Sequence, residues 1–192
     1  MTKPLFRDDA YLQDAPAIVT AHTQEGGLIL DASVFYPTGG GQPGDSGRLE
    51  WSGGAINIAT SIKGDTDSII LVPSEPVALP AVGTEVFQRL DWGRRHRHMR
   101  VHTALHLLSV VIPMPVTGGS IGAEKGRLDF AMDEPLEDKT ALEDALHALI
   151  EQDLPVTETW ITDDALLADP SRVKTMSVMP PAGQGRVRLV RI

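Results

Sequence analysis

Two histidines, His102 and His106, have the type and spacing best suited to chemistry in this chain. They stand four residues apart in a stretch with a helical pattern, so both imidazoles are expected on one face, with Cβ atoms about 5–6 Å apart. Two ring nitrogens at this spacing can bind one zinc ion. A closed site needs two further ligands, and a catalytic site needs at least one more and a water. The pair predicts part of a metal centre, although paired histidines also cap helices and pack in cores.

Two glycine-rich segments are candidates for ligand-binding loops. Gly39, Gly40 and Gly41 precede Gln42, and a backbone without Cβ atoms can approach a ligand closely. The run lacks the Lys and Ser/Thr that follow the last glycine of a phosphate-binding loop. A flexible turn is the alternative interpretation. The second segment, Thr117–Ser120, is either a ligand loop or the start of a strand.

Arginines and further histidines surround the histidine pair. The arginines of residues 94–100 form either a phosphate-contacting face or the solvated start of a helix. His96 and His98 are expected to contact RNA or to be exposed at that helix start, with a role as outer metal ligands as the third possibility. The chain has no cysteine and no G-x-S-x-G motif, and nothing pairs Ser120 with a base. A metal-held water is therefore the most economical nucleophile.

Composition limits the classes of protein that fit. The 192 residues are 42% hydrophobic and 22% charged, which is ordinary for a soluble globular protein. No apolar run approaches the ~20 residues that span a bilayer, and the N-terminus does not resemble a secretory signal. We expect a cytoplasmic protein with no membrane partner.

The net charge of −9 argues against general binding to nucleic acid, and no DNA partner is expected. The arginines are nevertheless concentrated in two places, which suits a specific polyanion. These arginines are Arg89, Arg94, Arg95, Arg97 and Arg100 in the first group, and Arg186, Arg188 and Arg191 in the second.

Residues 1–88 are predicted to form a small β-barrel domain that carries the first glycine-rich segment, because short strand patterns follow one another at regular spacing. The expected strands are Ala17–His22, Leu28–Asp31, Arg48–Trp51, Ala55–Ile62, Ser68–Val72 and Thr84–Leu90.

Residues 89–192 are predicted to form a second domain in which helices and strands alternate, giving an α+β protein overall. Apolar residues recur at helical spacing from Arg94 to Ile112, and Asp138 is placed to cap a helix whose buried stripe ends at Ile150. The expected elements are helices Arg94–Ile112, Lys139–Leu154 and Asp163–Ala168, the last capped by Asp163, and strands Val116–Ile121, Arg127–Met132, Val156–Ile161 and Gly185–Ile192.

Three motifs in order resemble the alanyl-tRNA editing proteins of the AlaX type, which are free-standing relatives of the editing domain of alanyl-tRNA synthetase. The motifs are F-Y-P-T-G-G-G-Q-P-G-D-S-G at 35–47, R-V-H-T-A-L-H-L-L at 100–108, and G-G-S-I-G-A-E-K-G-R-L-D-F at 118–130. The resemblance covers nearly the whole chain. It implies a small N-terminal β-barrel followed by the α/β sandwich shared by the editing domains of threonyl- and alanyl-tRNA synthetases.

The resemblance also implies an activity and roles for residues. The activity would be hydrolysis of the ester that joins serine or glycine to tRNA(Ala), so mischarged tRNA(Ala) is the expected partner. His102 and His106 would be zinc ligands, and Thr103 and Gln42 would act in catalysis. The expected substrate-binding residues are Gly39, Gly40, Gly41, Gln42, Arg100 and Ser120.

The chain departs from the family pattern at one point. Members of the family complete the zinc site with a later C-x-x-x-H motif, and this sequence contains neither a cysteine nor a late histidine. We expect a C-terminally shortened member whose second domain and zinc site are incomplete. The alternative hypotheses are a metal-free, non-catalytic tRNA-binding module of the same fold, and an unrelated metal-dependent hydrolase of a small ester or amide.

Overall fold

The computed structural model describes residues 1–134, 136–169 and 185–192. The chain forms two compact units. Unit 1 comprises Met1–Met99 with Ile121–Glu124, and unit 2 comprises Arg100–Ser120 with Lys125–Ile192. The predicted division into domains at residues 1–88 and 89–192 stays a prediction, because compactness does not test whether either part folds alone.

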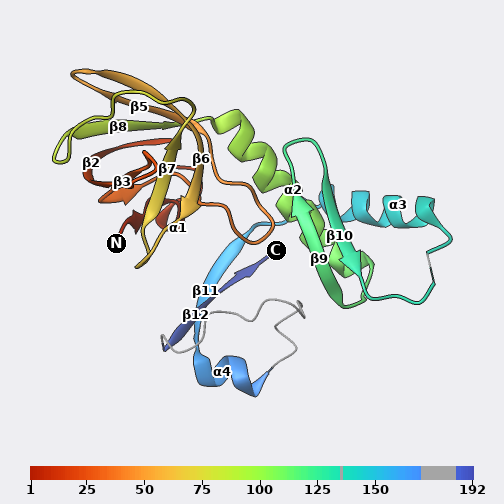
Figure 1. Cartoon of the computed structure of the whole chain (residues 1–192). Coiled ribbons are helices and arrows are strands. Elements are labelled where there is room, and N and C mark those ends of the chain that lie inside the picture. Colours follow the sequence, from red (N-terminus) through yellow and green to blue (C-terminus); the bar gives the residue numbers. More distant parts are fainter. Residues whose placement is uncertain (135, 170–184) are drawn as a thin grey trace. The chain divides into compact units, whose positions relative to one another are not determined.

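Unit 1 contains a closed barrel whose strands follow one another in the order β2-β3-β7-β6-β5-β8 (Figure 1). The neighbouring pairs are antiparallel. This finding confirms the predicted N-terminal barrel. The strands are β2 (Asp14–His22), β3 (Leu28–Leu30), β5 (Gly47–Trp51), β6 (Gly54–Lys63), β7 (Ile69–Pro73) and β8 (Glu85–Leu90).

Alternating side chains fill the barrel. In β2, Ala15, Ala17 and Val19 are buried while the residues between them are exposed, as the period of two of a strand requires. Leu28 of β3 and Leu49 of β5 are fully buried in the same core. Each such leucine contributes roughly 1.5–3 kcal/mol of hydrophobic stabilisation. The barrel is therefore a packed support for the loops at its ends.

Three short elements, β1 (Lys3–Pro4), α1 (Leu5–Asp8) and β4 (Ala32–Ser33), were not predicted from the sequence. Strand β1 pairs in parallel with β4, and α1 follows β1 directly. The buried Thr2 hydroxyl donates to the Leu30 carbonyl at 2.8 Å. Two-residue strands have no periodicity to detect, so only these long-range hydrogen bonds define them.

The second half contains helices and paired strands, which together with the barrel confirms the predicted α+β class. Helix α2 (Trp92–Val111) contributes its residues through Met99 to unit 1 and the remainder to unit 2. The described strands after α2 form two separate two-stranded sheets, β9-β10 and β11-β12. The remaining elements are β9 (Val116–Ile121), β10 (Gly126–Phe130), α3 (Lys139–Ile150), β11 (Thr157–Thr162), α4 (Asp163–Ala168) and β12 (Arg186–Arg191).

Two helix ends and one core assignment differ from expectation. Helix α3 ends at Ile150 rather than Leu154, and Asp153 has a left-handed φ of 47° that a continuing helix cannot accommodate. Ile150 is 47% exposed, so it does not belong to a buried stripe. Thr162 rather than Asp163 caps α4, because the Thr162 hydroxyl accepts from the Ala165 amide at 3.1 Å. The predicted Asp138 cap of α3 is confirmed by its bond from the Ala141 amide at 2.9 Å.

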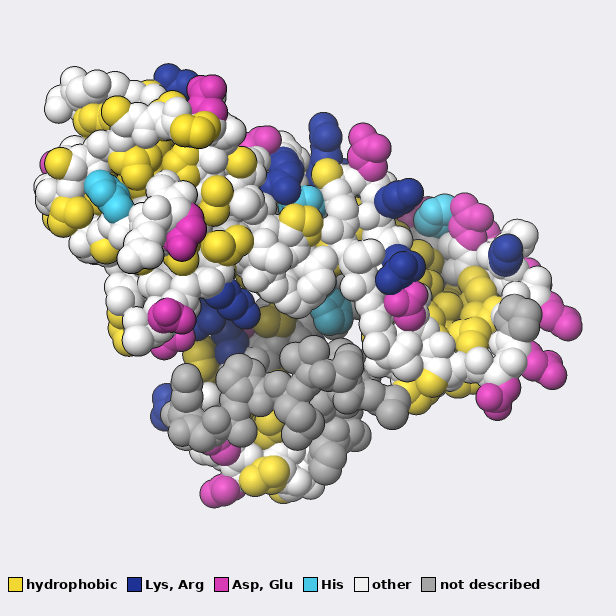
Figure 2. All heavy atoms as spheres, viewed as in Figure 1, with side chains coloured by type: hydrophobic (Ala, Val, Ile, Leu, Met, Phe, Trp, Pro, Cys, Tyr) yellow, Lys and Arg dark blue, Asp and Glu magenta, His cyan; other side chains and the backbone are white. Residues whose placement is uncertain are grey.

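Acidic side chains gather over the loop between β10 and α3 (Figure 2). Asp133, Glu134, Glu137 and Asp138 are all exposed there. Among the described helices, none combines the length and hydropathy needed to cross a bilayer. These exposed acids are part of the excess of 26 acidic over 17 basic residues that gives the chain its net charge of −9.

Candidate functional site

His102 and His106 lie on α2 in unit 2. Their rings stack with centroids 5.0 Å apart and planes 19° apart, which confirms that one face of the helix carries both. Burial, and then the charge of His106, lower the pKa of His102 below its usual value of 6.5. At neutral pH His102 is therefore a neutral imidazole, the form that binds a metal ion or accepts a proton.

A zinc centre needs more than this pair. Among the residues that the structure describes, no group of three or more His, Asp or Glu side chains is arranged to hold a metal ion. Imidazole lone pairs lie in the ring plane, so a near-parallel stack directs them side by side, and chelation would require a ring to rotate. These residues match two zinc ligands and not a complete set, so no reaction step is assigned to zinc.

The first glycine run forms a tight turn in unit 1. The Gly39 amide donates to the Gln42 carbonyl and the Gln42 amide donates to the Gly39 carbonyl, each at 3.0 Å. Gly40 and Gly41, the two central residues, have φ values of 59° and 79°. Positive φ at both central positions is the type I′ arrangement, which glycine adopts without strain. The run is therefore a hydrogen-bonded turn.

The tip of this turn is held on one side and open on the other. The Gly41 carbonyl accepts from the Ile121 amide at 2.8 Å, and Gln42 is only 5% exposed. The Gly40 and Gly41 amides donate to no acceptor among the described residues. Two adjacent N–H groups at a loop tip can stabilise a carbonyl oxygen or an oxyanion.

Asp45, which the sequence analysis did not single out, closes the base of the same loop. Its Oδ2 accepts from the Tyr36 amide at 2.7 Å and from Arg95 Nε at 2.8 Å, and Arg95 Nη2 donates to it as well. The Asp45 amide donates back to the Tyr36 carbonyl at 2.9 Å. The motif at 35–47 did contain this acid, directly after Gly44. Its basic partner Arg95, however, lies on α2, and the sequence does not show that the two residues meet.

The arginine-rich start of α2 is not one surface. Arg95 is 3% exposed and donates to the buried Asp45 carboxylate. It is therefore neither on a phosphate-contacting face nor at a solvated helix start, and both predictions are wrong for this residue. Arg94 Nη1 donates to the Gly44 carbonyl at 2.8 Å. Arg97 and Arg100 are exposed and stay candidates for phosphate contact. The face of α2 on which each arginine lies therefore decides whether it bonds to the barrel unit, as Arg94 and Arg95 do, or is exposed to solvent.

The two histidines of this segment also differ. His96 is half-buried and stacks on Trp92, with ring centroids 5.4 Å apart. His98 is 1% exposed, which contradicts the expected exposed or RNA-contacting position. His98 follows Arg95 by three residues, so the helical period places both side chains on the same face of α2, which is buried. Burial, then the charge of Arg94, lower the pKa of His98.

The predicted catalytic residue Thr103 and the remaining predicted substrate-binding residues, Arg100 and Ser120, lie in unit 2. Thr103 is half-buried beside His102 in sequence, while Arg100 and Ser120 are exposed. The hairpin β9-β10 lies against α2, since a Cβ on Gly126 would come 2.7 Å from Val101 Cγ1. Because Gly39–Gln42 belongs to unit 1 and His102 to unit 2, their roles in one site stay predictions.

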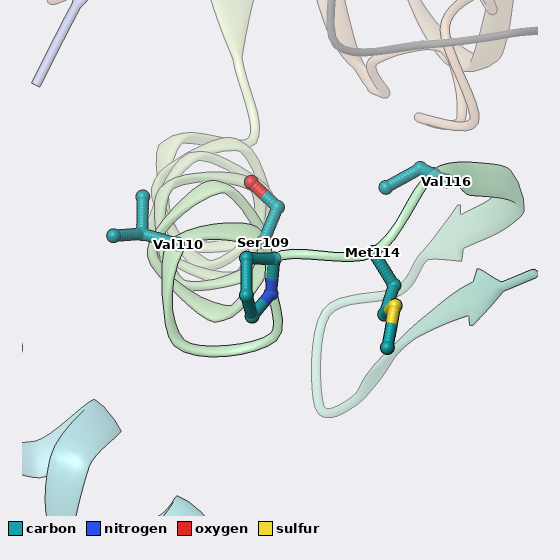
Figure 3. Close-up of a pocket in the computed structure, with 5 residues that line it drawn as sticks. Ser109, Val110, Met114 and Val116 are labelled. Atoms are coloured by element: carbon teal, nitrogen blue, oxygen red, sulfur yellow. The ribbon is translucent and has the colours of Figure 1, made fainter. Parts of the chain in front are cut away.

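A shallow hollow of about 410 Å³ follows the end of α2, between that helix and the start of β9 (Figure 3). No predicted site residue contributes to it, and its chemistry is mainly apolar. The residues that line it are Ser109, Val110, Pro113, Met114 and Val116.

Known proteins are similar to this chain in sequence. Residues 11–94 match the family described as tRNA synthetases class II (A). The alanyl-tRNA editing protein AlaX-M of Methanosarcina barkeri is 34% identical over 92% of this chain and 76% of its own length. The AlaX-M of Methanosarcina acetivorans is 33% identical over 100% of this chain and 82% of its own length. The chain belongs to the alanyl-tRNA editing protein family.

Ligases contain a similar segment. The alanine–tRNA ligase of Pyrobaculum arsenaticum is 33% identical over 81% of this chain, which corresponds to 18% of the ligase. A segment similar to this chain thus occurs both in separate AlaX-M proteins and as a small part of a ligase. These findings confirm the resemblance that the three motifs indicated.

Proposed function

We propose that this chain hydrolyses the ester that joins serine or glycine to mischarged tRNA(Ala). The observation that carries the proposal is the similarity to AlaX-M proteins over almost the entire chain. The aminoacyl-tRNAs on which the proposal depends occur in the cytoplasm, so it keeps the cytoplasmic location expected from the sequence.

The glycine turn supplies the chemistry that ester hydrolysis needs at the carbonyl. Attack of water on the ester carbon places negative charge on the carbonyl oxygen, and fixed N–H donors stabilise that charge. The Gly40 and Gly41 amides are such donors, and the reciprocal bonds between Gly39 and Gln42 hold them in place. In this proposal Gln42 and Thr103 contact the aminoacyl group, and Arg100 and Ser120 contact the tRNA end.

Selective editing has a physical basis. Serine differs from alanine by one hydroxyl, and a pocket that only excludes by size discriminates poorly between them. A hydrolytic site with buried polar groups that bond the hydroxyl rejects alanine, because those groups would lose their partner. The buried Gln42 amide is the polar group we assign to this task.

Zinc is part of the proposal, with His102 and His106 as two of its ligands. A bound zinc ion activates water and polarises a carbonyl oxygen. The neutral His102 ring supports this assignment. Purified protein would be measured for zinc content by mass spectrometry, beside the His102→Ala/His106→Ala variant and a His22→Ala control. Equal zinc content in all three would exclude the pair as ligands.

The deciding experiment is release of amino acid from Ser-tRNA(Ala), with Gly-tRNA(Ala) as a second substrate and Ala-tRNA(Ala) as control. We expect serine and glycine to be released faster than alanine. Intact Ser-tRNA(Ala) in the presence of zinc would reject the hydrolase.

A non-catalytic tRNA-binding module is the second candidate. The exposed Arg97 and Arg100 on α2 favour it, because solvated arginines bind phosphate without any metal. Binding of tRNA(Ala) without release of the amino acid would support this candidate over the hydrolase.

A further inference from the structure

The strongest unassigned feature of unit 1 is a buried ion pair at the base of the glycine loop. The side chains of Arg95 and Asp45 are 4% and 2% exposed. A buried ion pair adds little to stability on average, because desolvation offsets the attraction between the charges. Its presence in the barrel unit calls for a reason other than stability.

The contacts of Asp45 supply that reason. Its Oδ2 receives the Tyr36 amide at 2.7 Å, and its own amide donates to the Tyr36 carbonyl at 2.9 Å. These two bonds join the first and last residues of the segment 36–45. The loop that carries the glycine turn is therefore closed at its neck by the carboxylate and the backbone amide of Asp45.

Arg95 anchors this neck to the rest of the unit. Its Nη2 donates to the Val34 carbonyl at 2.8 Å, and its Nη1 donates to the Ala10 carbonyl at 3.4 Å. Its Nε donates to Asp45 Oδ2 at 2.8 Å. One guanidinium thus ties α2 to three chain segments, a task that needs the planar fork of arginine and that lysine cannot repeat.

The neck is connected to the turn by further polar contacts. The Tyr36 hydroxyl donates to the Gly39 carbonyl at 3.1 Å, and the Gly44 amide donates to Thr38 Oγ1 at 2.9 Å. Burial, and then the Asp45 carboxylate, raise the pKa of Tyr36, so its hydroxyl keeps the proton that it donates. The Tyr36 hydroxyl therefore links the neck of the loop directly to Gly39.

We propose that Asp45 and Arg95 are a positioning pair that fixes the glycine turn for substrate. This inference rests on the proposed function, because the turn is the part of the site that receives the aminoacyl ester. Neither residue touches the substrate in this scheme. They act through Tyr36 and the loop neck.

The test separates positioning from stability. In the double variant Asp45→Leu/Arg95→Met, apolar side chains replace both charges together, so that neither charge is left buried without its partner. We expect cooperative urea unfolding, but amide exchange at Gly39 and Gln42 at least about tenfold faster than in the wild type. We also expect kcat for Ser-tRNA(Ala) to fall about 10- to 100-fold with a smaller change in KM.

Matched variants complete the design. Lys3→Met/Asp8→Leu removes the exposed pair in which Lys3 Nζ lies 3.2 Å from Asp8 Oδ2, and it should change neither exchange at the turn nor kcat. Arg95→Lys keeps the charge without the fork and serves if the double variant does not fold. It should speed exchange and lower kcat as well.

The outcomes are distinct. Unchanged exchange at Gly39 and Gln42 in a folded Asp45→Leu/Arg95→Met or Arg95→Lys protein would overturn the positioning role. If the wild type releases no amino acid, the proposed function fails, and the exchange measurement alone still decides whether the pair orders the turn.

Discussion

Glycines of the same loop are required for different physical reasons. Gly40 and Gly41 have positive φ values, which side chains disfavour whatever space surrounds them. Gly44 has no such backbone requirement, but a Cβ there would lie 1.9 Å from the Ser61 carbonyl oxygen. The first two glycines shape the turn, and the third lets the loop lie against β6.

Gly44→Ala should destabilise the protein by about 3 kcal/mol or more, or prevent folding, because backbone atoms of β6 cannot move aside. Gly93→Ala is the matched control, since its Cβ would meet only Asp91 Oδ1 at 3.7 Å. That control should be neutral or stabilising by up to about 1 kcal/mol. Urea unfolding of both variants measures the difference, and equal midpoints would refute the close-approach argument.

His98 should make stability depend on pH. Its folded-state pKa lies below the usual value of 6.5, because burial and the charges of Arg94 and Arg95 oppose protonation more than Asp45 and Asp91 favour it. At pH values near and below 6.5, position 98 therefore binds more protons in the unfolded chain than in the folded protein. The contribution of neutral His98 to the free energy of unfolding is thus complete above pH 6.5 and decreases on acidification.

Urea unfolding at pH 5, 6, 7 and 8 measures this effect. We expect the wild type to lose stability toward pH 5, and His98→Gln to lose less over the same range. His22→Gln is the control, because His22 Nε2 lies at an exposed strand end, 2.9 Å from the Pro80 carbonyl oxygen. Parallel pH curves for the wild type and His98→Gln would assign the dependence to other groups.

At the scale of elements, helix α3 depends on its cap more than on packing. None of its residues is fully buried, so local interactions carry much of its stability. Asp138 satisfies one of the free amides of the first turn through its bond from Ala141.

Asp138→Ala should cost about 1 kcal/mol of helix stability, whereas Asp138→Asn should cost only a few tenths, because asparagine caps as well as aspartate. Amide exchange within Lys139–Ile150 is the appropriate measurement, since the barrel can remain folded while α3 opens. Equal effects of both substitutions would indicate that charge and not the capping bond matters.

At the scale of the whole molecule, an acidic protein must bind an acidic partner through a few local positive charges. Arg97 and Arg100 are exposed on α2, far in sequence from the acidic loop before α3. Each arginine that contacts a phosphate releases counterions, which makes tRNA affinity depend on salt.

Arg97→Gln and Arg100→Gln should each weaken tRNA binding and reduce the slope of log K against log salt by about 0.7–0.9. Arg48→Gln on the barrel is the control, because Arg48 Nε already lies 3.2 Å from Glu50 Oε1. Filter binding at several salt concentrations gives the slopes. An unchanged slope would show that the substituted arginine does not contact tRNA phosphate.

The sequence by itself determined the local features of this protein. Alternating apolar residues predicted the barrel strands, helical spacing predicted α2 and α3, and the four-residue interval placed His102 and His106 on one face. Three ordered motifs were enough to identify the family. These features depend on neighbours along the chain, so periodicity and short motifs reveal them.

Tertiary structure decided which polar residues are exposed and which are buried. Arg95 and Arg97 are two residues apart on α2, yet Arg95 is buried with Asp45, fifty residues earlier in the chain, and Arg97 is exposed. His98 is likewise buried, whereas His96, two residues before it, is only half-buried. The pairing of Arg95 with Asp45 depends on packing between distant segments, and no local pattern in a single sequence predicts it. The glycine turn was visible in the sequence, but the pair that holds it was not.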